Sequence, residues 1–391
     1  MAKKEQNEFE IARKKRRRKF AAQRSRKFIG AVLLFAILCG GIYFFIEEDV
    51  AGIIGDRIAS SASAGEGFPV DISGTNVIKT FTVGEHFGVL TDAVYYLYAE
   101  NGKQLLSAQH DFANPKVEAA GRRFLVYDQG GNRLFVRMRD KILFEKEFEY
   151  KIISADLSAD GILSVVTSAQ RYASQLHVFD ENYEEEIFTW SASDEYIVCA
   201  SADSGSKTVA AAALSANESG EMVTTVHVFT TEAAVELASK EFKGASVLGL
   251  EYDDNGDIKL ICDTIAAVIN KDGNILGRSL YNSVPVGAIN ISGKAGAVII
   301  FDRFTEARAT DALFLGENFE ETKTVSIPGK YVCNDGNLSQ NAIYCSGIGY
   351  IFNGSGECAA KLESEQDANL IQLGKESLFA ITRDQFCKIE K

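Results

Sequence analysis

The chain has 391 residues, of which 46% are hydrophobic and 24% are charged. This length exceeds one ordinary layered domain, and the apolar pattern is too even for several separate domains, so a repeat architecture is favoured. The net charge of −13 conceals a split, because residues 1–27 carry +9 and the rest of the chain carries −22. The two parts are therefore expected in different environments.

A membrane span is predicted for residues 28–46 (FIGAVLLFAILCGGIYFFI), which contain no acidic or basic side chain. A helix of this length measures about 29 Å, close to the ~30 Å hydrocarbon core of a bilayer. Backbone polar groups in lipid must be satisfied internally, which requires a helix. Basic residues precede the span and Glu47, Glu48 and Asp49 follow it. The positive-inside rule therefore predicts a cytoplasmic tail (1–27) and an extracytoplasmic remainder at the plasma membrane.

A cleaved signal peptide is the alternative to an anchor, because Ala62-Ser63-Ala64 resembles a cleavage site. The apolar run is longer than a usual signal-peptide core and ends far before Ala62, which favours the anchor. Cys39 would suit a lipoprotein, but Leu38 stands where a small residue is needed. The basic run beside a span is more typical of topology and anionic lipid than of nucleic acid, so no nucleic-acid partner is expected. Residues 47–67, rich in Gly, Ser and Ala, are predicted to form a flexible stalk.

Residues 68–391 are predicted to form an all-β propeller, because short apolar stretches alternate with Gly, Asn and Asp turns. A turn followed by an apolar strand recurs eight times, at 35–51-residue intervals. The turns are anchored at Gly84, Gly121, Gly161, Gly205, Gly256, Gly296, Gln340 and Lys375. A period of about 40 residues with four short strands per unit is typical of propeller blades. Eight blades are predicted, or seven if two short units merge.

The two ends of the repeat are predicted to meet. The eighth unit stops after SLFAIT and QFCKIEK and lacks an outermost strand, whereas residues 68–72 (FPVDI) have no blade of their own. An open ring would expose a strand edge and an apolar blade face, so this N-terminal strand is predicted to complete the last blade. The longest interval, Gly205 to Gly256, predicts a loop around residues 216–222.

No residue is predicted to be catalytic, cofactor-binding or metal-binding. His177 and His227 hold matching third-strand positions, which favours packing over catalysis. His-x-x-x-His, Cys-x-x-Cys, G-x-S-x-G and phosphate-loop motifs are missing from the sequence. The acidic turn from Asp253 to Asp257 resembles a calcium loop but lacks the later bidentate Glu, so it is interpreted as a turn.

Six cysteines fall in the predicted extracytoplasmic domain, and an even number there leaves disulfides open, with Cys333 and Cys345 as the best-placed pair. Free cysteine also behaves as a small buried hydrophobe, and buried thiols are favoured. The six are Cys199, Cys262, Cys333, Cys345, Cys358 and Cys387.

Two phrases carry a family resemblance: FPVDISG from Phe68 and VYDQGG from Val126, after a basic tail, one span and a Gly/Ser stalk. Together they resemble the bacterial domain-of-unknown-function family 5711, single-pass membrane proteins with an extracytoplasmic β-propeller. The resemblance covers nearly the whole chain and implies no activity. More remotely, the units are similar to quinoprotein-like and WD-like propellers. The quinoprotein Trp-docking repeat and the Trp-Asp dipeptide are missing, so no quinone cofactor is expected.

Two functional hypotheses follow. The first is a non-enzymatic platform that docks an envelope protein or polymer at the outer membrane face, which the tether and the acidic ring favour. The alternative is an enzyme or small-ligand binder that uses carboxylates at the propeller mouth, with Asp128, Asp263 and Asp302 at the ends of anchor strands. The platform is favoured over the enzyme, although the propeller fold itself selects no function.

Overall fold

The computed structural model describes residues 67–203, 205, 207–281, 284–292, 296–301, 308–320, 322–337, 339–364, 367–374 and 377–389. Regular structure in these ranges consists of β-strands, and none of it is a helix long and apolar enough to cross a membrane. The predicted tail, span and nearly all of the stalk lie outside the described residues. The membrane topology therefore stays a prediction.

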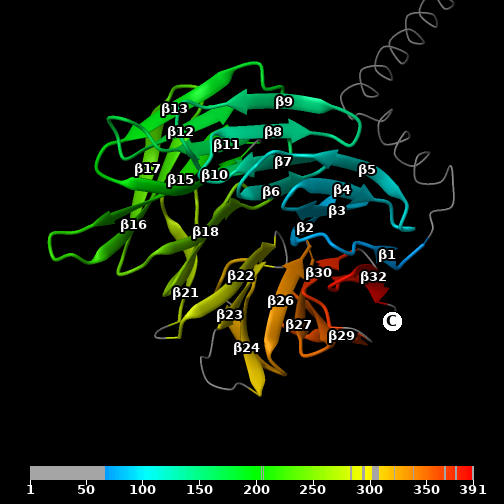
Figure 1. Cartoon of the computed structure of the whole chain (residues 1–391). Helices are drawn as coiled ribbons and strands as arrows, with labels where there is room; N and C mark the ends of the chain where they lie inside the picture. The colour runs from blue at the N-terminus through cyan, green and yellow to red at the C-terminus, as the bar shows by residue number, and fades with distance from the viewer. Residues whose placement is uncertain are drawn as a thin grey trace, which may run out of the picture. The chain divides into compact units, whose positions relative to one another are not determined.

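The strands form eight four-stranded antiparallel sheets, the blades of a propeller (Figure 1). Blades 1 to 7 each take four consecutive strands, and the first strands of neighbouring blades contact one another around the axis. Blade 1 comprises β2 (Val77–Val83), β3 (His86–Thr91), β4 (Val94–Tyr98) and β5 (Gln104–Gln109). Blade 2 comprises β6 (Pro115–Ala120), β7 (Arg123–Asp128), β8 (Arg133–Arg137) and β9 (Ile142–Glu147). Blade 3 comprises β10 (Ile152–Leu157), β11 (Leu163–Thr167), β12 (Ser174–Phe179) and β13 (Glu186–Ala192).

The next four blades continue the same order. Blade 4 comprises β14 (Tyr196–Asp203), β15 (Thr208–Ala216), β16 (Met222–Thr230) and β17 (Val235–Lys243). Blade 5 comprises β18 (Val247–Tyr252), β19 (Ile258–Cys262), β20 (Ile265–Ile269) and β21 (Ile275–Leu280). Blade 6 comprises β22 (Val286–Ser292), β23 (Gly296–Phe301), β24 (Ala309–Leu315) and β25 (Thr322–Pro328). Blade 7 comprises β26 (Tyr331–Gly336), β27 (Gln340–Cys345), β28 (Ile348–Asn353) and β29 (Cys358–Glu363).

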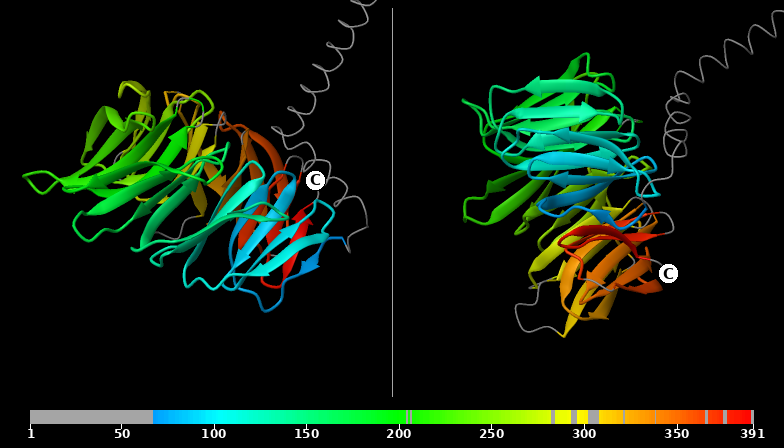
Figure 2. Two further views of the ribbon diagram at one scale, coloured as in Figure 1. Left: turned by 90° about the horizontal axis from the view of Figure 1, so that it is seen from above. Right: turned by 45° about the vertical axis from the view of Figure 1, so that its right-hand side comes forward.

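Blade 8 joins the two ends of the ring. It consists of β30 (Leu370–Leu373), β31 (Leu378–Ile381) and β32 (Gln385–Ile389), with β1 (Val70–Asp71) as its outermost strand. Figure 2 shows β1, in blue, beside the red C-terminal strands. The predicted closure by the N-terminal strand is confirmed, as is the count of eight blades. The pairing itself is short, because only Val70 and Asp71 face β32 in register.

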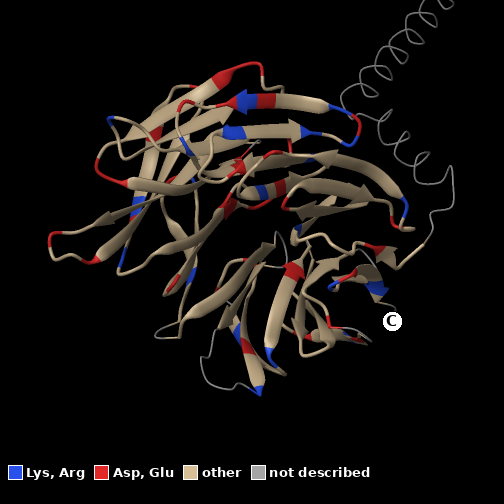
Figure 3. Cartoon of the chain, in the orientation of Figure 1, with Lys and Arg blue, Asp and Glu red and all other residues tan. Residues whose placement is uncertain are grey.

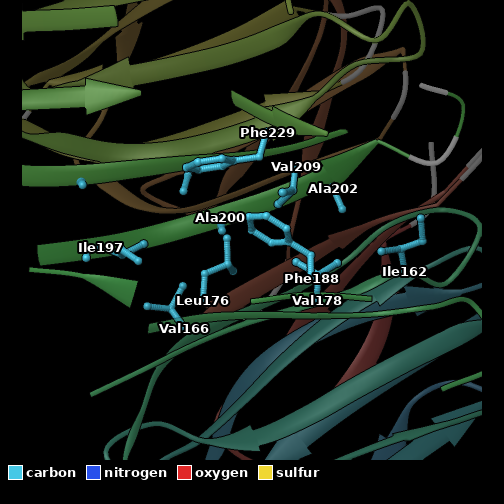
Figure 4. Packing of buried hydrophobic residues seen from close by; sticks show 13 residues of the cluster. Ile162, Val166, Leu176, Val178, Phe188, Ile197, Ala200, Ala202, Val209 and Phe229 are labelled. Carbon is cyan, nitrogen blue, oxygen red and sulfur yellow. The ribbon is translucent and has the colours of Figure 1, made fainter. Parts of the chain in front are cut away.

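The hydrophobic core is divided among the seams between blades, with one buried cluster in each of the eight seams. Successive side chains of a strand point to opposite faces, so one strand serves two seams. In β15, Val209 and Ala211 pack toward blade 3, whereas Ala210 and Ala212 pack toward blade 5. Figure 4 shows the seam between blades 3 and 4, where the rings of Phe188 and Phe229 lie 5.2 Å apart.

The periodic glycines mark the turns into the second strand of a blade. At five of the anchors the backbone has a positive φ, which glycine adopts without a steric penalty because it has no Cβ. These are Gly84 (59°), Gly121 (57°), Gly161 (98°), Gly256 (78°) and Gly296 (75°). The spacing in the sequence therefore reports a repeated hairpin.

The longest interval between anchors is explained by blade 4. A turn at residues 217–221 connects β15 to β16, which confirms the predicted loop. The remaining extra length lies in β15, β16 and β17, which have nine residues each.

Candidate functional site

The innermost strands of six blades share one irregularity, a single residue skipped in the register with the second strand. Such a β-bulge re-aims a side chain out of the regular alternation. We call the skipped residues the axial collar, because innermost strands line the axis. Three of them are exposed: Leu248 at 45%, Val332 at 42%, and Gly287, which has no side chain. The collar comprises Ile78, Ile153, Val198, Leu248, Gly287 and Val332.

A second set of side chains follows three residues after the collar and is polar. It comprises Asp156, Ser201, Glu251, Asn290 and Asp335, which we call the axial belt. Blade 1 departs from this pattern with the buried Phe81. Figure 3 shows acidic segments on innermost strands such as β26. In the collar, Ile153 and Val198 pack partly into the seams between blades, and in the belt Ser201 is buried. The exposed part of this region therefore combines the apolar Leu248 and Val332 with the acidic Glu251.

Part of this polar set holds the ring together near blade 8. Gln372 of β30 donates from Nε2 to Thr82 Oγ1 of blade 1 at 2.7 Å and to Asp335 Oδ2 of blade 7 at 3.2 Å. The backbone N–H of the residue after Gln372 also donates to Asp335 Oδ2, at 2.6 Å. Burial raises the pKa of Asp335 to about 6, although these donors oppose the shift. Asp335 is therefore committed to the seams between blades.

Glu251 is less satisfied than the other belt carboxylates. Solvent reaches its side chain, although the innermost strands surround it, and it makes no hydrogen bond or ion pair with the described residues. Burial raises the pKa of Glu251 to about 8, and repulsion from Asp156 and Glu118 adds to this shift. Burial also raises the pKa of Asp156 to about 6, while a hydrogen bond from Ser201 opposes the rise. These two carboxylates can accept a proton or another cation.

Lys79 is a cation within the same region, but it has partners. Its Nζ lies 3.0 and 3.1 Å from the two carboxylate oxygens of Glu118 and 2.9 Å from the carbonyl oxygen of Val117. Lys79 therefore offsets the charge of Glu118 and links blades 1 and 2. Its positive charge also opposes the raised pKa values of Asp156 and Glu251, but it donates to neither.

The carboxylates predicted at the mouth are engaged elsewhere. Asp128 Oδ1 accepts a hydrogen bond from the backbone N–H of Asn114 at 2.8 Å, and Asp263 Oδ1 accepts one from that of Ser246 at 2.7 Å. Each carboxylate thus ties the second strand of its blade to the turn that leads into the innermost strand. Asp302 lies outside the described residues. The structure therefore does not bring Asp128 and Asp263 to the axis.

The matched histidines are each paired with a glutamate from the neighbouring outermost strand. His177 Nδ1 lies 2.6 Å from Glu186, and His227 Nδ1 lies 2.7 Å from Glu236. His227 Nε2 also lies 3.2 Å from Glu195, at the entry to blade 4. The matching third-strand positions are confirmed, and both histidines serve contacts between strands and seams.

Glu186 predicts an acid-dependent loss of stability. The hydrogen bond with His177 is the main cause that lowers the pKa of Glu186 from 4.5 to about 2. A lowered folded-state pKa stabilises the fold above the unfolded value and ceases to do so as pH falls through the folded value. We expect the free energy of unfolding, measured with urea, to fall between pH 5 and pH 2 less steeply in Glu186→Gln than in the parent. Equal slopes would contradict this assignment.

The acidic turn of blade 5 is built around its own first side chain. Asp253 Oδ1 accepts hydrogen bonds from the backbone N–H groups of Asn255 and Asp257 at 2.8 and 3.1 Å. Its other oxygen lies 3.7 Å from Lys259 Nζ, and both side chains are almost fully buried. In the described part of the chain, no three His, Cys, Asp or Glu residues are grouped to hold a metal ion.

The six propeller cysteines are free thiols. Cys262, Cys333 and Cys345 are buried, Cys199 and Cys387 are half-buried, and Cys358 is exposed. The favoured interpretation of buried thiols thus holds fully for three of them and is wrong for Cys358. Burial raises the pKa of Cys262 and Cys333 to about 12, which suppresses the reactive thiolate.

Thiol labelling provides a direct measurement of this arrangement. In a Cys39→Ser background, we expect Cys358 to react with a maleimide first in the folded protein, because it alone among the described thiols is exposed. All six propeller thiols should react in urea. The control is Cys358→Ser in the same background, which should remove the fast phase; a fast phase that persists would contradict the structure.

The belt acids were missed by reasoning from motifs, although a periodic signal exists. Asp156, Glu251 and Asp335 each precede the anchor of their unit by five residues, at Gly161, Gly256 and Gln340. Alignment of the eight repeat units on their anchors would have revealed this pattern. Its significance depends on the ring, since only closure brings residues about 90 positions apart to one axis.

A model of a family of unknown function (DUF5711) matches residues 60–281, more than half of the chain. The chain belongs to this family. A comparison with curated proteins found no match. The DUF5711 match includes the first five blades, and it confirms the family resemblance inferred from FPVDISG and VYDQGG.

Two solved propellers illustrate the structural similarity. The crystal structure of BamB from Moraxella catarrhalis matches with a TM-score of 0.52 and 10% identity, covering 82% of this chain and 100% of that one. The C-terminal WD40 domain of Sif2 matches with a TM-score of 0.58 and 11% identity, covering 82% and 97%. At such identities the likeness establishes the fold alone. The remote similarity to quinoprotein-like and WD-like propellers is confirmed at that level.

Proposed function

We propose that this protein is a membrane-anchored, extracytoplasmic propeller that acts as a non-enzymatic platform for an envelope protein or polymer. The observation that carries the proposal is the exposure of two apolar collar side chains, Leu248 and Val332, each three residues before an acidic belt residue on the same strand. Exposed apolar groups rimmed by polar residues are typical of interaction sites. The predicted span at residues 28–46 would hold this ring near the outer face of the membrane.

Photo-crosslinking in intact cells tests the platform. A photoreactive amino acid at Leu248 should capture one defined neighbour, because this position lies on the axis. The matched control is Leu280, which is 63% exposed on the outermost strand β21. The proposal would be contradicted if the photoreactive residue at Leu280 captured the same neighbour equally well. It would also be contradicted if the residue at Leu248 captured no neighbour and the protein showed a measurable hydrolase activity.

The membrane topology has its own test. A membrane-impermeant maleimide should label Cys358 in intact cells if the propeller lies outside, because that thiol is exposed. Cys358→Ser is the control. The mature protein should also run at full length in isolated membranes. Labelling only after lysis would overturn the orientation, and a loss of about 64 residues would favour signal cleavage instead.

A small-ligand binder or enzyme at the mouth remains the second candidate function, and Glu251 is the observation that favours it. Its raised pKa of about 8 would suit a proton donor or acceptor near neutral pH. Asp128 and Asp263 do not support this candidate, because backbone N–H groups occupy them. Loss of a cellular phenotype in Glu251→Gln with the Leu248 crosslink intact would favour this candidate over the platform.

A further inference from the structure

We propose that the axial surface binds a basic segment of a partner polypeptide, with a Lys or Arg side chain placed against Glu251 and Asp156. This inference rests on the proposed platform function and names the chemistry of its partner. Six ionisable groups lie in this region, and four of them are acids: Lys79, Lys259, Glu118, Asp156, Glu251 and Asp335. Each of the two cations already has an acidic partner, Glu118 for Lys79 and Asp253 for Lys259.

The remaining acids differ in how far they are already satisfied. Asp335 receives two donors from blade 8. Asp156 receives a hydrogen bond from Ser201, and Glu251 receives none from the described residues. The negative charges of Asp156 and Glu251 repel each other, which makes ionisation of Glu251 less favourable. A cation placed between the two carboxylates would relieve this repulsion. Charge complementarity therefore selects a cationic ligand for this part of the belt.

Two nearly fully buried oxygen atoms beside the belt supply a second, independent argument. Ser164 lies directly opposite Asp156 in the register of β10 and β11, is 1% exposed, and its Oγ has no hydrogen-bond partner among the described residues. Gln372 is 4% exposed, donates to Asp335, and its Oε1 likewise has no partner there. Buried polar atoms are rarely left unsatisfied. Each oxygen can accept a hydrogen bond, which favours a ligand rich in N–H donors, as Lys and Arg are.

The collar explains why the ligand would be a polypeptide segment rather than a free inorganic cation. Leu248 and Val332 are exposed one level away from Glu251 and Asp335 on the same strands. The aliphatic stem of Lys or Arg packs on apolar surface while its charged head remains among polar groups. Apolar residues flanking the basic one would cover the rest of the collar. The ligand we infer is thus a basic residue between apolar neighbours.

The test uses the full chain in detergent and a fluorescent, end-blocked peptide probe, Gly-Leu-Arg-Leu-Gly, with Gly-Leu-Glu-Leu-Gly as its counterpart. Binding is measured by anisotropy. At pH 9, where both carboxylates are ionised, the double variant Asp156→Asn with Glu251→Gln should weaken binding of the Arg peptide about tenfold, since two charge contacts are lost. The matched control is Asp254→Asn with Glu218→Gln, which removes two charges from exposed turns and should leave binding unchanged.

A second variant is expected to strengthen binding, which a misfolded protein would not do. Lys79→Gln removes the positive charge that is paired with Glu118. It should strengthen binding of the Arg peptide, because the carboxylate of Glu118 then becomes available to the ligand. Binding should also strengthen from pH 6 to pH 9 as the belt acids, Glu251 above all, lose their protons. The other charged groups that act on this pair are Lys79, Lys259 and Glu118, and the thiol of Cys199 is a further titratable group beside both carboxylates.

Three outcomes would overturn the inference: equal binding of the Glu peptide, equal weakening by the control pair, or unchanged binding in the double variant. If the peptide fails while the Leu248 crosslink still captures a neighbour, the platform stands and the basic partner is wrong. If both fail, the platform itself is wrong.

Discussion

Phe386→Ala is expected to lower the free energy of unfolding by about 3–5 kcal/mol, because it empties the centre of the seam that closes the ring. Phe386 lies on β32, is fully buried, and packs against Phe68, Phe379 and Tyr98 at ring-centroid distances of 5.2, 5.7 and 5.7 Å. These rings come from both ends of the propeller sequence. One substitution therefore weakens blade 8 and its contact with blade 1 together.

The closure depends on side chains to an unusual degree. In blade 8 the outermost strand pairs with its neighbour through only two residues, Val70 and Asp71. In blade 4 the equivalent pair of strands is in register over most of nine residues. Few ladder hydrogen bonds thus hold β1, and the aromatic cluster must supply the remaining stabilisation.

Urea unfolding of the full chain in detergent, followed by circular dichroism, measures this effect. The control is Ile142→Ala, on an outermost strand with 53% exposure, which should change stability by no more than about 0.5 kcal/mol. Phe188→Ala, in the seam between blades 3 and 4, separates ring closure from ordinary core packing. A loss below about 1 kcal/mol for Phe386→Ala would show that the ends do not meet as described.

Asp253→Asn should cost about 3 kcal/mol, because it removes one partner of a buried ion pair and leaves the Lys259 charge in the core. The side chains of Lys259 and Asp253 are only 1% and 4% exposed. The turn itself should survive, since Asn can accept the same two backbone hydrogen bonds. Asn270 demonstrates this in the turn between β20 and β21 of the same blade, where its Oδ1 accepts from the backbone N–H groups of Asp272 and Asn274 at 3.1 and 2.9 Å.

The reciprocal control is Asn270→Asp, which adds a carboxylate to the turn without a buried lysine beside it. This change should alter the unfolding free energy by less than about 1 kcal/mol. Lys259→Met provides a further comparison, because it removes the buried charge and fills its volume, and should cost less than Asp253→Asn. If Asp253→Asn proves as mild as Asn270→Asp, the pair contributes nothing and the turn is the only role of Asp253.

Much of the fold could be predicted because the repeat is local. The glycine anchors arise from a hairpin that needs positive φ, as at Gly161 and Gly256, and such a requirement acts within a few residues. The number of blades and the missing strand of the last unit follow from counting these hairpins. The exact partner of β1 also follows, since only one blade lacks an outermost strand.

The candidate site could not be predicted in the same way. Asp128 and Asp263 stand at strand ends in the sequence, and whether such a carboxylate faces the axis or caps a nearby N–H depends on turn geometry. Glu251 and Asp156 are 95 positions apart, so their mutual repulsion exists only in the closed ring. Neither residue belongs to a recognisable motif.

The sequence by itself determined the repeat, its eight units, the closing strand and the DUF5711 resemblance, because each depends on local pattern or on chain order. It also carries the predicted span, whose 19 residues lie outside the described structure. Only the tertiary structure decided which side chains share the axis and which carboxylate there receives no hydrogen bond from the described residues. The reason is physical: burial, repulsion and hydrogen-bond supply are properties of the assembled ring, and no single blade contains them.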